Sequence, residues 1–177
     1  MKIGLCGTMS VGKTTLVNAL KNLSEFKNYT FRTERSKYLR DIGIPLNTDS
    51  TVKGQSIFLA ERASELMQEN IITDRTILDV MAFARCSKSM NYLEAQHFCD
   101  FASNMLHEYD YIFYVSPEGV DIEDNGVRET NSDYRKLIDQ NILLLIEKNK
   151  FKIKNLVKIN GSTEDRIKQI KDTLVSL

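Results

Sequence analysis

Residues 7–14 of the chain read Gly7-Thr8-Met9-Ser10-Val11-Gly12-Lys13-Thr14. This stretch matches the pattern G-x-x-x-x-G-K-[ST] of a phosphate-binding P-loop at every position. The largely apolar residues 2–6 before it are typical of a short buried strand, and residues 15–23 after it carry apolar side chains at the spacing of one helix face. Strand, glycine-rich loop and helix therefore follow one another in the order that a P-loop requires.

The residue types of this loop suit the binding of a polyphosphate. Gly7 and Gly12 let the backbone turn where a Cβ would clash, so that successive N–H groups can point at phosphate oxygens. The partial positive charge of the following helix N-terminus adds to this attraction. Lys13 is expected to reach the β- and γ-phosphates, and the Thr14 hydroxyl to ligate Mg²⁺. The residues expected to contact the nucleotide here are Gly7, Thr8, Ser10, Val11, Gly12, Lys13, Thr14 and, beside the α-phosphate, Thr15.

Length and charge are those of an ordinary globular domain. The 177 residues are enough for one domain with a buried core, so residues 1–177 are expected to form a single domain. Lys and Arg together number 24, as do Asp and Glu, and the formal net charge is zero. A balanced charge gives no overall field for gripping nucleic acid, although a local basic groove is compatible with it.

Cysteine usage and hydropathy indicate the compartment. The three cysteines, at positions 6, 86 and 99, are an odd number without metal-site spacing, which favours a reducing setting inside the cell. The sequence shows no signal peptide and no apolar run long enough to cross a membrane. We therefore expect a cytoplasmic protein without a membrane partner, either monomeric or homodimeric.

Strand-like and helix-like segments alternate along the chain. Besides 2–6, strand-like composition occurs at 29–33, 70–73, 111–115 and 156–159. Helical patterns cover 52–68, 77–84, 92–106 and 133–148, with a final helix after Gly161. This alternation predicts an α/β protein with a three-layer P-loop NTPase fold, in which helices cover both faces of a mostly parallel sheet of about five strands. Ligands on such sheets bind at the carboxyl ends of the strands.

Two acidic residues follow predicted strands at that same edge. Asp74 ends the third strand, where its carboxylate could hold Mg²⁺ beside the P-loop. Glu34 follows the second strand, where it could accept the proton of an attacking hydroxyl. Each could instead serve as a helix cap or first-turn acid. Glu61 and Asp79 remain alternatives as the general base, although Asp79 could also pair with Arg75.

The polar stretch 117–130 is the one long irregular segment of the sequence. Its length is typical of a functional loop, and Gly126 could serve as its hinge. Because a planar guanidinium matches the charge of a transferred phosphoryl group, Arg128 in this stretch is expected to act in catalysis. The sequence thus predicts a lid over the nucleotide, at about residues 117–135.

Side chains of the acceptor site are expected near the second and third strands. Arg35 and Arg75 follow these strands, and Gln55 lies on the helix that would border the pocket, where it could read a base edge. Arg62 and Arg166 are expected to be solvated surface charges. Aromatic residues at helical spacing are expected to belong to the core.

Several blocks of sequence beyond the P-loop carry a resemblance to known kinases. They are TERSKYL at 33–39, GQSIFLAER at 54–62, IITDRTILDVMAFAR at 71–85, DNGVRET at 124–130 and INGSTEDRIKQI at 159–170. Together with the P-loop they resemble the P-loop ATPase/kinase family of ribosylnicotinamide kinase domains, whose wider kin are thymidylate-kinase-like enzymes. This resemblance implies a nucleoside-monophosphate-kinase-like fold with a lid, ATP with Mg²⁺, and phosphoryl transfer to a hydroxyl or phosphate of a nucleoside- or nucleotide-like acceptor.

The resemblance also implies roles for single residues. Residues 7–15 would hold the phosphates, Glu34 and Arg35 would face the acceptor, and Asp74-Arg75 would end the metal-side strand. Arg128 would belong to the lid, and Gly161-Ser162 would border the adenine.

The acceptor class stays open at this point. Thr76-Ile77 stand where the thymidylate kinase signature has Tyr or Phe after Asp-Arg, which argues against a thymidylate kinase. Relatives in bacterial viruses resemble kinases acting on hydroxymethylated pyrimidine bases, so DNA is an alternative acceptor to a free nucleoside or nucleotide. A GTPase switch fits poorly, because the sequence has no Asp-x-x-Gly and Asn149-Lys150 is not followed by x-Asp.

Overall fold

The computed structural model describes residues 1–33, 35–119 and 131–175. In these residues one sheet is formed by five strands, β1 (Lys2–Cys6), β2 (Thr30–Arg32), β3 (Ile71–Asp74), β4 (Tyr111–Val115) and β5 (Leu156–Ile159). The strand order is β2-β3-β1-β4-β5, and every neighbouring pair is parallel. The predicted parallel α/β sheet is confirmed.

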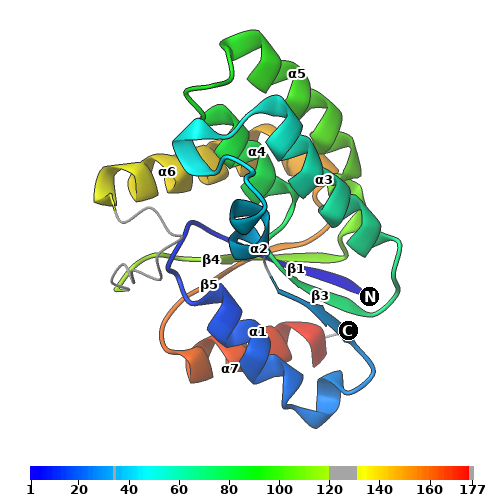
Figure 1. Cartoon of the computed structure of the whole chain (residues 1–177). Helices are drawn as coiled ribbons and strands as arrows, with labels where there is room; N and C mark the ends of the chain where they lie inside the picture. Colours follow the sequence, from blue (N-terminus) through cyan, green and yellow to red (C-terminus); the bar gives the residue numbers. More distant parts are fainter. Residues whose placement is uncertain (34, 120–130, 176–177) are drawn as a thin grey trace.

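Helices cover both faces of the sheet, which gives the molecule three layers (Figure 1). On one face lie α1 (Lys13–Lys21) and α7 (Thr163–Val175). The other face carries α3 (Val52–Leu66), α4 (Ile77–Arg85), α5 (Tyr92–Ala102) and α6 (Ser132–Lys148). A short helix, α2, spans Ser36–Asp41. The helix expected over 92–106 ends at Ala102 and continues as a 3₁₀ turn over Ser103–Glu108, where the Ser103 hydroxyl bonds back to the carbonyl of Asp100 at 2.9 Å.

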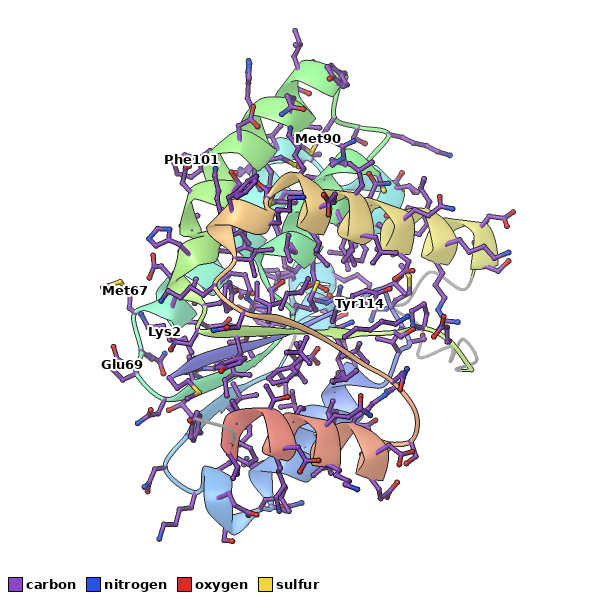
Figure 2. The ribbon with its side chains drawn as sticks, turned by 180° about the vertical axis from the view of Figure 1, so that it is seen from behind. Lys2, Met67, Glu69, Met90, Phe101 and Tyr114 are labelled. Carbon is purple, nitrogen blue, oxygen red and sulfur yellow. The ribbon has the colours of Figure 1, made fainter. Side chains whose placement is uncertain are left out.

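Strand β4 shows why the core has two halves. All five of its residues are buried, as expected of a strand covered on both faces. Tyr111, Phe113 and Val115 belong to the core beneath α1 and α7, whereas Ile112 and Tyr114 belong to the core beneath α4 and α6. This alternation follows from the two-residue period of a strand. Tyr114 points toward the α6 side, where its hydroxyl donates to Asp139 at 2.8 Å (Figure 2).

The sheet register brings the functional segments together. Strand β1 lies at the centre of the sheet, and its residue Leu5 is paired with Asp74 at the end of β3. The loop after β1 therefore starts beside the carboxyl end of β3. In the part of the chain that the structure describes, no helix is both long and apolar enough to span a membrane.

Candidate active site

The loop between β1 and α1 has the backbone geometry of a phosphate-binding loop. Gly7 adopts φ 154°, and a Cβ at this position would lie 2.7 Å from the carbonyl oxygen of Val115. Gly12, which precedes α1, adopts φ 82°, and Ser10 is also left-handed at φ 56°. Close approach to β4 thus requires glycine at position 7, and backbone conformation favours it at position 12.

Lys13 and Thr14 lie in the first turn of α1, where they contact the loop and the end of β3. The buried Lys13 ammonium donates to the carbonyl oxygens of Gly7 at 2.5 Å and Thr8 at 2.7 Å. Burial, followed by repulsion from Arg75, lowers the pKa of Lys13. The Thr14 hydroxyl donates to the Asp74 carboxylate. A hydroxyl and a carboxylate oxygen in contact at a helix N-terminus form a donor set that suits Mg²⁺.

Arg62 supports Asp74 from within the protein. It is only 2% exposed, and its guanidinium donates to the backbone carbonyl of Asp74 at 3.3 Å and to the Glu65 carboxylate at 2.7 Å. The expectation that Arg62 is a solvated surface charge is therefore wrong. Its charge is paired inside the protein, where it fixes the end of β3 behind the proposed metal ligand.

Asp79 is a structural residue of the loop and not a base in the cleft. It is fully buried and forms a capping box with Thr76, accepting from the Thr76 N–H at 2.7 Å and hydroxyl at 2.9 Å. Its other carboxylate oxygen accepts from the N–H of Gly7 at 3.1 Å. Because both oxygens are engaged away from the cavity, Asp79 is removed from the candidates for the general base.

Replacement of Asp79 by asparagine is expected to destabilise the fold. Asparagine would present an NH₂ group to buried donors, so the free energy of unfolding should fall by about 2–4 kcal/mol. The matched control is Glu94→Gln in the exposed capping box of Asn91 and Glu94, which should cost about 1 kcal/mol or less. Urea unfolding of both variants measures the difference. An equal fall in the free energy of unfolding of the two variants would mean that the contact of Asp79 with Gly7 does not stabilise the loop.

A cavity of about 300 Å³ opens in front of the loop. Its phosphate-side wall consists of residues 9–14 together with Asp74 and Arg75. The remaining wall is formed by Ser36, Lys37, Leu46, Asn47, Gln55, Phe58, Val80 and Phe83. Phe58 and Phe83 were expected to be core residues, but they face this cavity as well as packing against the core.

Arg75 enters the cavity from a strained backbone. It has φ 87°, unusual for a residue with a side chain, and its N–H donates to the carbonyl of Leu5 at 3.0 Å. Its guanidinium lies 4.9 Å from the centre of the Phe83 ring. Such outliers persist where the surrounding structure holds them and are frequent at functional sites. Arg75 thus lies between the phosphate loop and the aromatic wall.

Gln55 contributes a polar group to the opposite wall. It is only 3% exposed and lines the cavity from α3. No hydrogen bond joins its side-chain amide to another described residue, and the amide is open to the cavity. An amide that lines a cavity can offer one acceptor and two donors to a molecule bound there.

Other predicted site residues lie outside the cavity lining. Arg35 is exposed, 3.4 Å from Glu61 and 4.7 Å above the Tyr38 ring, next to the cavity residue Ser36. Thr15 is exposed on α1. Thr8 is buried, and its hydroxyl donates a hydrogen bond to the carbonyl of Arg135 at 3.0 Å.

The predicted adenine-side and lid residues have different outcomes. Gly161 and Ser162 follow β5. Ser162 precedes α7, and its N–H and hydroxyl donate to the Asp165 carboxylate at 3.0 Å and 2.8 Å, respectively. Glu34, Arg128 and residues 120–130 of the predicted lid lie outside the described residues.

Two further arginines hold the outer side of the loop. Arg135 of α6 donates to the carbonyls of Met9 at 3.2 Å and Ser10 at 3.4 Å. Arg166 of α7 donates to the carbonyls of Val11 at 2.6 Å and Ser116 at 3.4 Å. Arg166 is 4% exposed, so its expected place on the solvated surface is wrong. The hydrogen bonds of both arginines to residues 9–11 join positions more than 120 apart, which no local pattern reveals.

Comparisons with known proteins agree with this geometry. A family model described as an AAA domain matches residues 2–166. A search among curated proteins gave no match. Similar solved structures include deoxyadenosine kinase from M. mycoides with bound dCTP, which has a TM-score of 0.67 and 19% identity over 100% of both chains.

Two further structures of that enzyme give the same likeness. One contains the products dCMP and a flexible dCDP, and the other contains dATP. Each has a TM-score of 0.67 and 19% identity. The first match covers 99% of this chain and the second covers 98%, and both cover 99% of the kinase chain. The likeness confirms the predicted three-layer P-loop NTPase fold, whereas the lid stays a prediction. Since the family model spans nearly the whole sequence, the chain belongs to this AAA domain family of P-loop proteins.

Proposed function

We propose that this protein is an ATP- and Mg²⁺-dependent kinase that transfers the γ-phosphoryl group to a hydroxyl, or a phosphate, of a nucleoside- or nucleotide-like acceptor. One observation carries the proposal. One cavity has the phosphate-binding loop at one end and, at the other, an aromatic wall with the Gln55 amide, which forms no hydrogen bond to another described residue. A donor and an acceptor bound there would meet at Lys13 and Arg75.

The donor half of the cavity binds and orients phosphate groups. The loop N–H groups and the α1 N-terminus would surround the β- and γ-phosphates, and Lys13 would leave the carbonyls of Gly7 and Thr8 to meet them. Thr14 and Asp74 would hold Mg²⁺, which neutralises charge on the phosphate oxygens when bound. Arg75 would stabilise the equatorial oxygens of the transferred group from the acceptor side.

The acceptor half suits a flat ring with polar edges. Phe58 and Phe83 offer aromatic surface, Val80 adds apolar surface, and Gln55 offers one acceptor and two donors. These are the groups that bind a nucleobase by stacking and edge recognition. The likeness in fold to deoxyadenosine kinase supports a nucleoside as the acceptor. The finer resemblance to ribosylnicotinamide kinase domains stays a prediction.

The general base remains part of the proposal. Glu34, which lies outside the described residues, keeps the role that the sequence suggests. Glu61 is the alternative on α3: its Oε1 is 3.4 Å from Arg35, and its buried Oε2 has no hydrogen bond to a described residue. A carboxylate within reach of the acceptor hydroxyl would accept its proton as the phosphoryl group arrives.

A base in DNA is the second candidate acceptor. The exposed residues Arg35, Tyr38 and Arg40 lie on or beside α2, and the neighbouring Lys37 lines the cavity. Cationic and aromatic side chains at the entrance of a pocket suit a polynucleotide whose base is flipped inward. Phosphoryl transfer to single-stranded DNA but not to free nucleosides would favour this candidate over the first.

Gln55→Leu is expected to damage acceptor selection more than nucleotide binding. Leucine fills a similar volume but cannot hydrogen-bond a base edge, so kcat/KM for the acceptor should fall by roughly 10–100-fold. KM for ATP should change by less than about twofold. Gln68→Leu, beyond the C-terminus of the same helix, is the matched control. Steady-state kinetics with the best acceptor would contradict this role if both variants behaved alike.

A further inference from the structure

Arg166 packs against the back of the phosphate-binding loop. It lies on α7, which runs beside α1 on the same face of the sheet (Figure 1). A Cβ on Gly12 would be 3.2 Å from its Nη1 atom, the same atom that donates to Val11. The guanidinium therefore touches the Val11–Gly12 peptide directly, and its second contact ties the loop to Ser116 at the end of β4.

The charge of Arg166 has no counter-ion in the part of the chain that the structure describes. Its hydrogen bonds to Val11 and Ser116 both go to backbone carbonyls, and its buried Nε has no hydrogen-bond partner among these residues. Arg62 is buried to a similar degree but has the carboxylate of Glu65 at 2.7 Å. A buried cation without an anion is costly. A polyphosphate in the adjacent loop would bring negative charge close to this guanidinium.

The contact with Val11 also sets the direction of an N–H group. The described peptide bonds are all trans, so a carbonyl and the N–H of the next residue point in opposite directions. With the Val11 carbonyl held by Arg166, the N–H of Gly12 is directed away from α7. Val11 and Gly12 line the cavity, whereas Arg166 does not. The left-handed backbone of Gly12 is thus held in the orientation that offers its N–H to a phosphate.

We propose that Arg166 is a positioning residue for the phosphate groups of the donor. It acts through the Val11–Gly12 peptide, and the bound polyphosphate balances its charge. The proposal rests on the proposed function only in taking a nucleoside triphosphate, or a simpler polyphosphate, as the ligand of the loop. Loss of Arg166 then weakens the binding of polyphosphate itself and leaves the number of binding-competent molecules unchanged.

Calorimetric titration tests this with two ligands, Mg²⁺·ATP and tripolyphosphate, which has no base or sugar. Arg166→Met is expected to raise Kd for both ligands by at least about tenfold, with the stoichiometry of the wild type. Arg166→Lys keeps the charge but cannot donate to both carbonyls as the planar guanidinium does. Its Kd should lie between those of the wild type and of Arg166→Met. Lys168→Met removes the same charge from an exposed position of α7 and should change Kd by less than about twofold.

Three results would overturn the proposal. The first is an Arg166→Met variant whose Kd values stay within twofold of the wild type. The second is a reduced stoichiometry with unchanged Kd, because partial unfolding removes sites without weakening them. The third is failure of both Arg166 variants to fold, judged by circular dichroism, since Arg166 would then serve only the stability of the fold. Wild-type protein that binds neither ligand would overturn the proposed function, and this proposal with it.

Discussion

Lys13→Ala is expected to lower the rate of phosphoryl transfer by at least about 10²-fold, because the cation that meets the β- and γ-phosphates is lost. The fold is expected to survive, since among the described residues the Lys13 ammonium donates hydrogen bonds to the loop carbonyls of Gly7 and Thr8 and to no other group. Lys21→Ala, which removes an exposed charge from the last turn of the same helix, should leave activity unchanged.

The comparison requires activity and folding to be measured on the same samples. Transfer of label from [γ-³²P]ATP gives the rate, and thermal unfolding shows whether the variant keeps its structure. A folded Lys13→Ala protein with wild-type transfer would contradict the proposed kinase function. Equal losses in Lys13→Ala and Lys21→Ala would assign the effect to the helix and not to the phosphate contact.

Asp74→Asn is expected to produce the second largest loss, roughly 10²-fold in kcat/KM, through the metal. Asparagine keeps an oxygen that can accept from Thr14 but carries no negative charge. The Mg²⁺ concentration for half-maximal activity should therefore rise by about tenfold or more. The buried pairing of Arg62 with Glu65 is untouched, so stability should change little.

A carboxylate at the opposite edge of the sheet is the control for this effect. Asp110 precedes β4, where it accepts from the N–H of Lys2 at 2.8 Å. Asp110→Asn should leave the Mg²⁺ dependence as in the wild type. If Asp74→Asn showed an unchanged Mg²⁺ dependence, Asp74 would be no metal ligand and its carboxylate would serve only to hold Thr14.

The sequence predicts those parts of the site that depend on neighbouring residues. The P-loop is a contiguous pattern, and the strands show as short apolar runs, of which Tyr111–Val115 has the bounds expected. Once the strands are assigned to one parallel sheet, Asp74 and Arg75 must lie at the edge where the loop begins. Their roles as metal ligand and acceptor contact stay predictions.

The buried arginines were missed because charge was given more weight than position. Arg62 is three residues after Leu59 and four before Leu66, both buried, so helical spacing places it on the inner face of α3. Arg166 is likewise four residues before the fully buried Ile170. Helical spacing alone would therefore have placed both arginines on the inner faces of their helices, although they were expected on the surface. The partners of Arg166, Val11 and Ser116, are distant in the sequence and were beyond any local pattern, whereas Glu65 lies three residues after Arg62 on the same helix.

The aromatic wall was missed for a different reason. Phe58 and Phe83 have the spacing of core residues and do pack against the core, but the cavity begins at their other side. A pattern of apolar residues does not distinguish a side chain enclosed by protein from one that borders an empty space. Gln55, four residues before Leu59, could be placed on the inner face, and the cavity there explains how an amide is accommodated.

Transfer of the terminal phosphoryl group to an added acceptor tests the central claim most directly. The wild-type protein would be incubated with Mg²⁺ and [γ-³²P]ATP, together with nucleosides, nucleoside monophosphates or single-stranded DNA bearing hydroxymethylated pyrimidines. The account predicts label on at least one of these acceptors, stoichiometric with ADP and abolished in Lys13→Ala. Release of phosphate to water alone, at a rate that no acceptor in the panel alters, would contradict it.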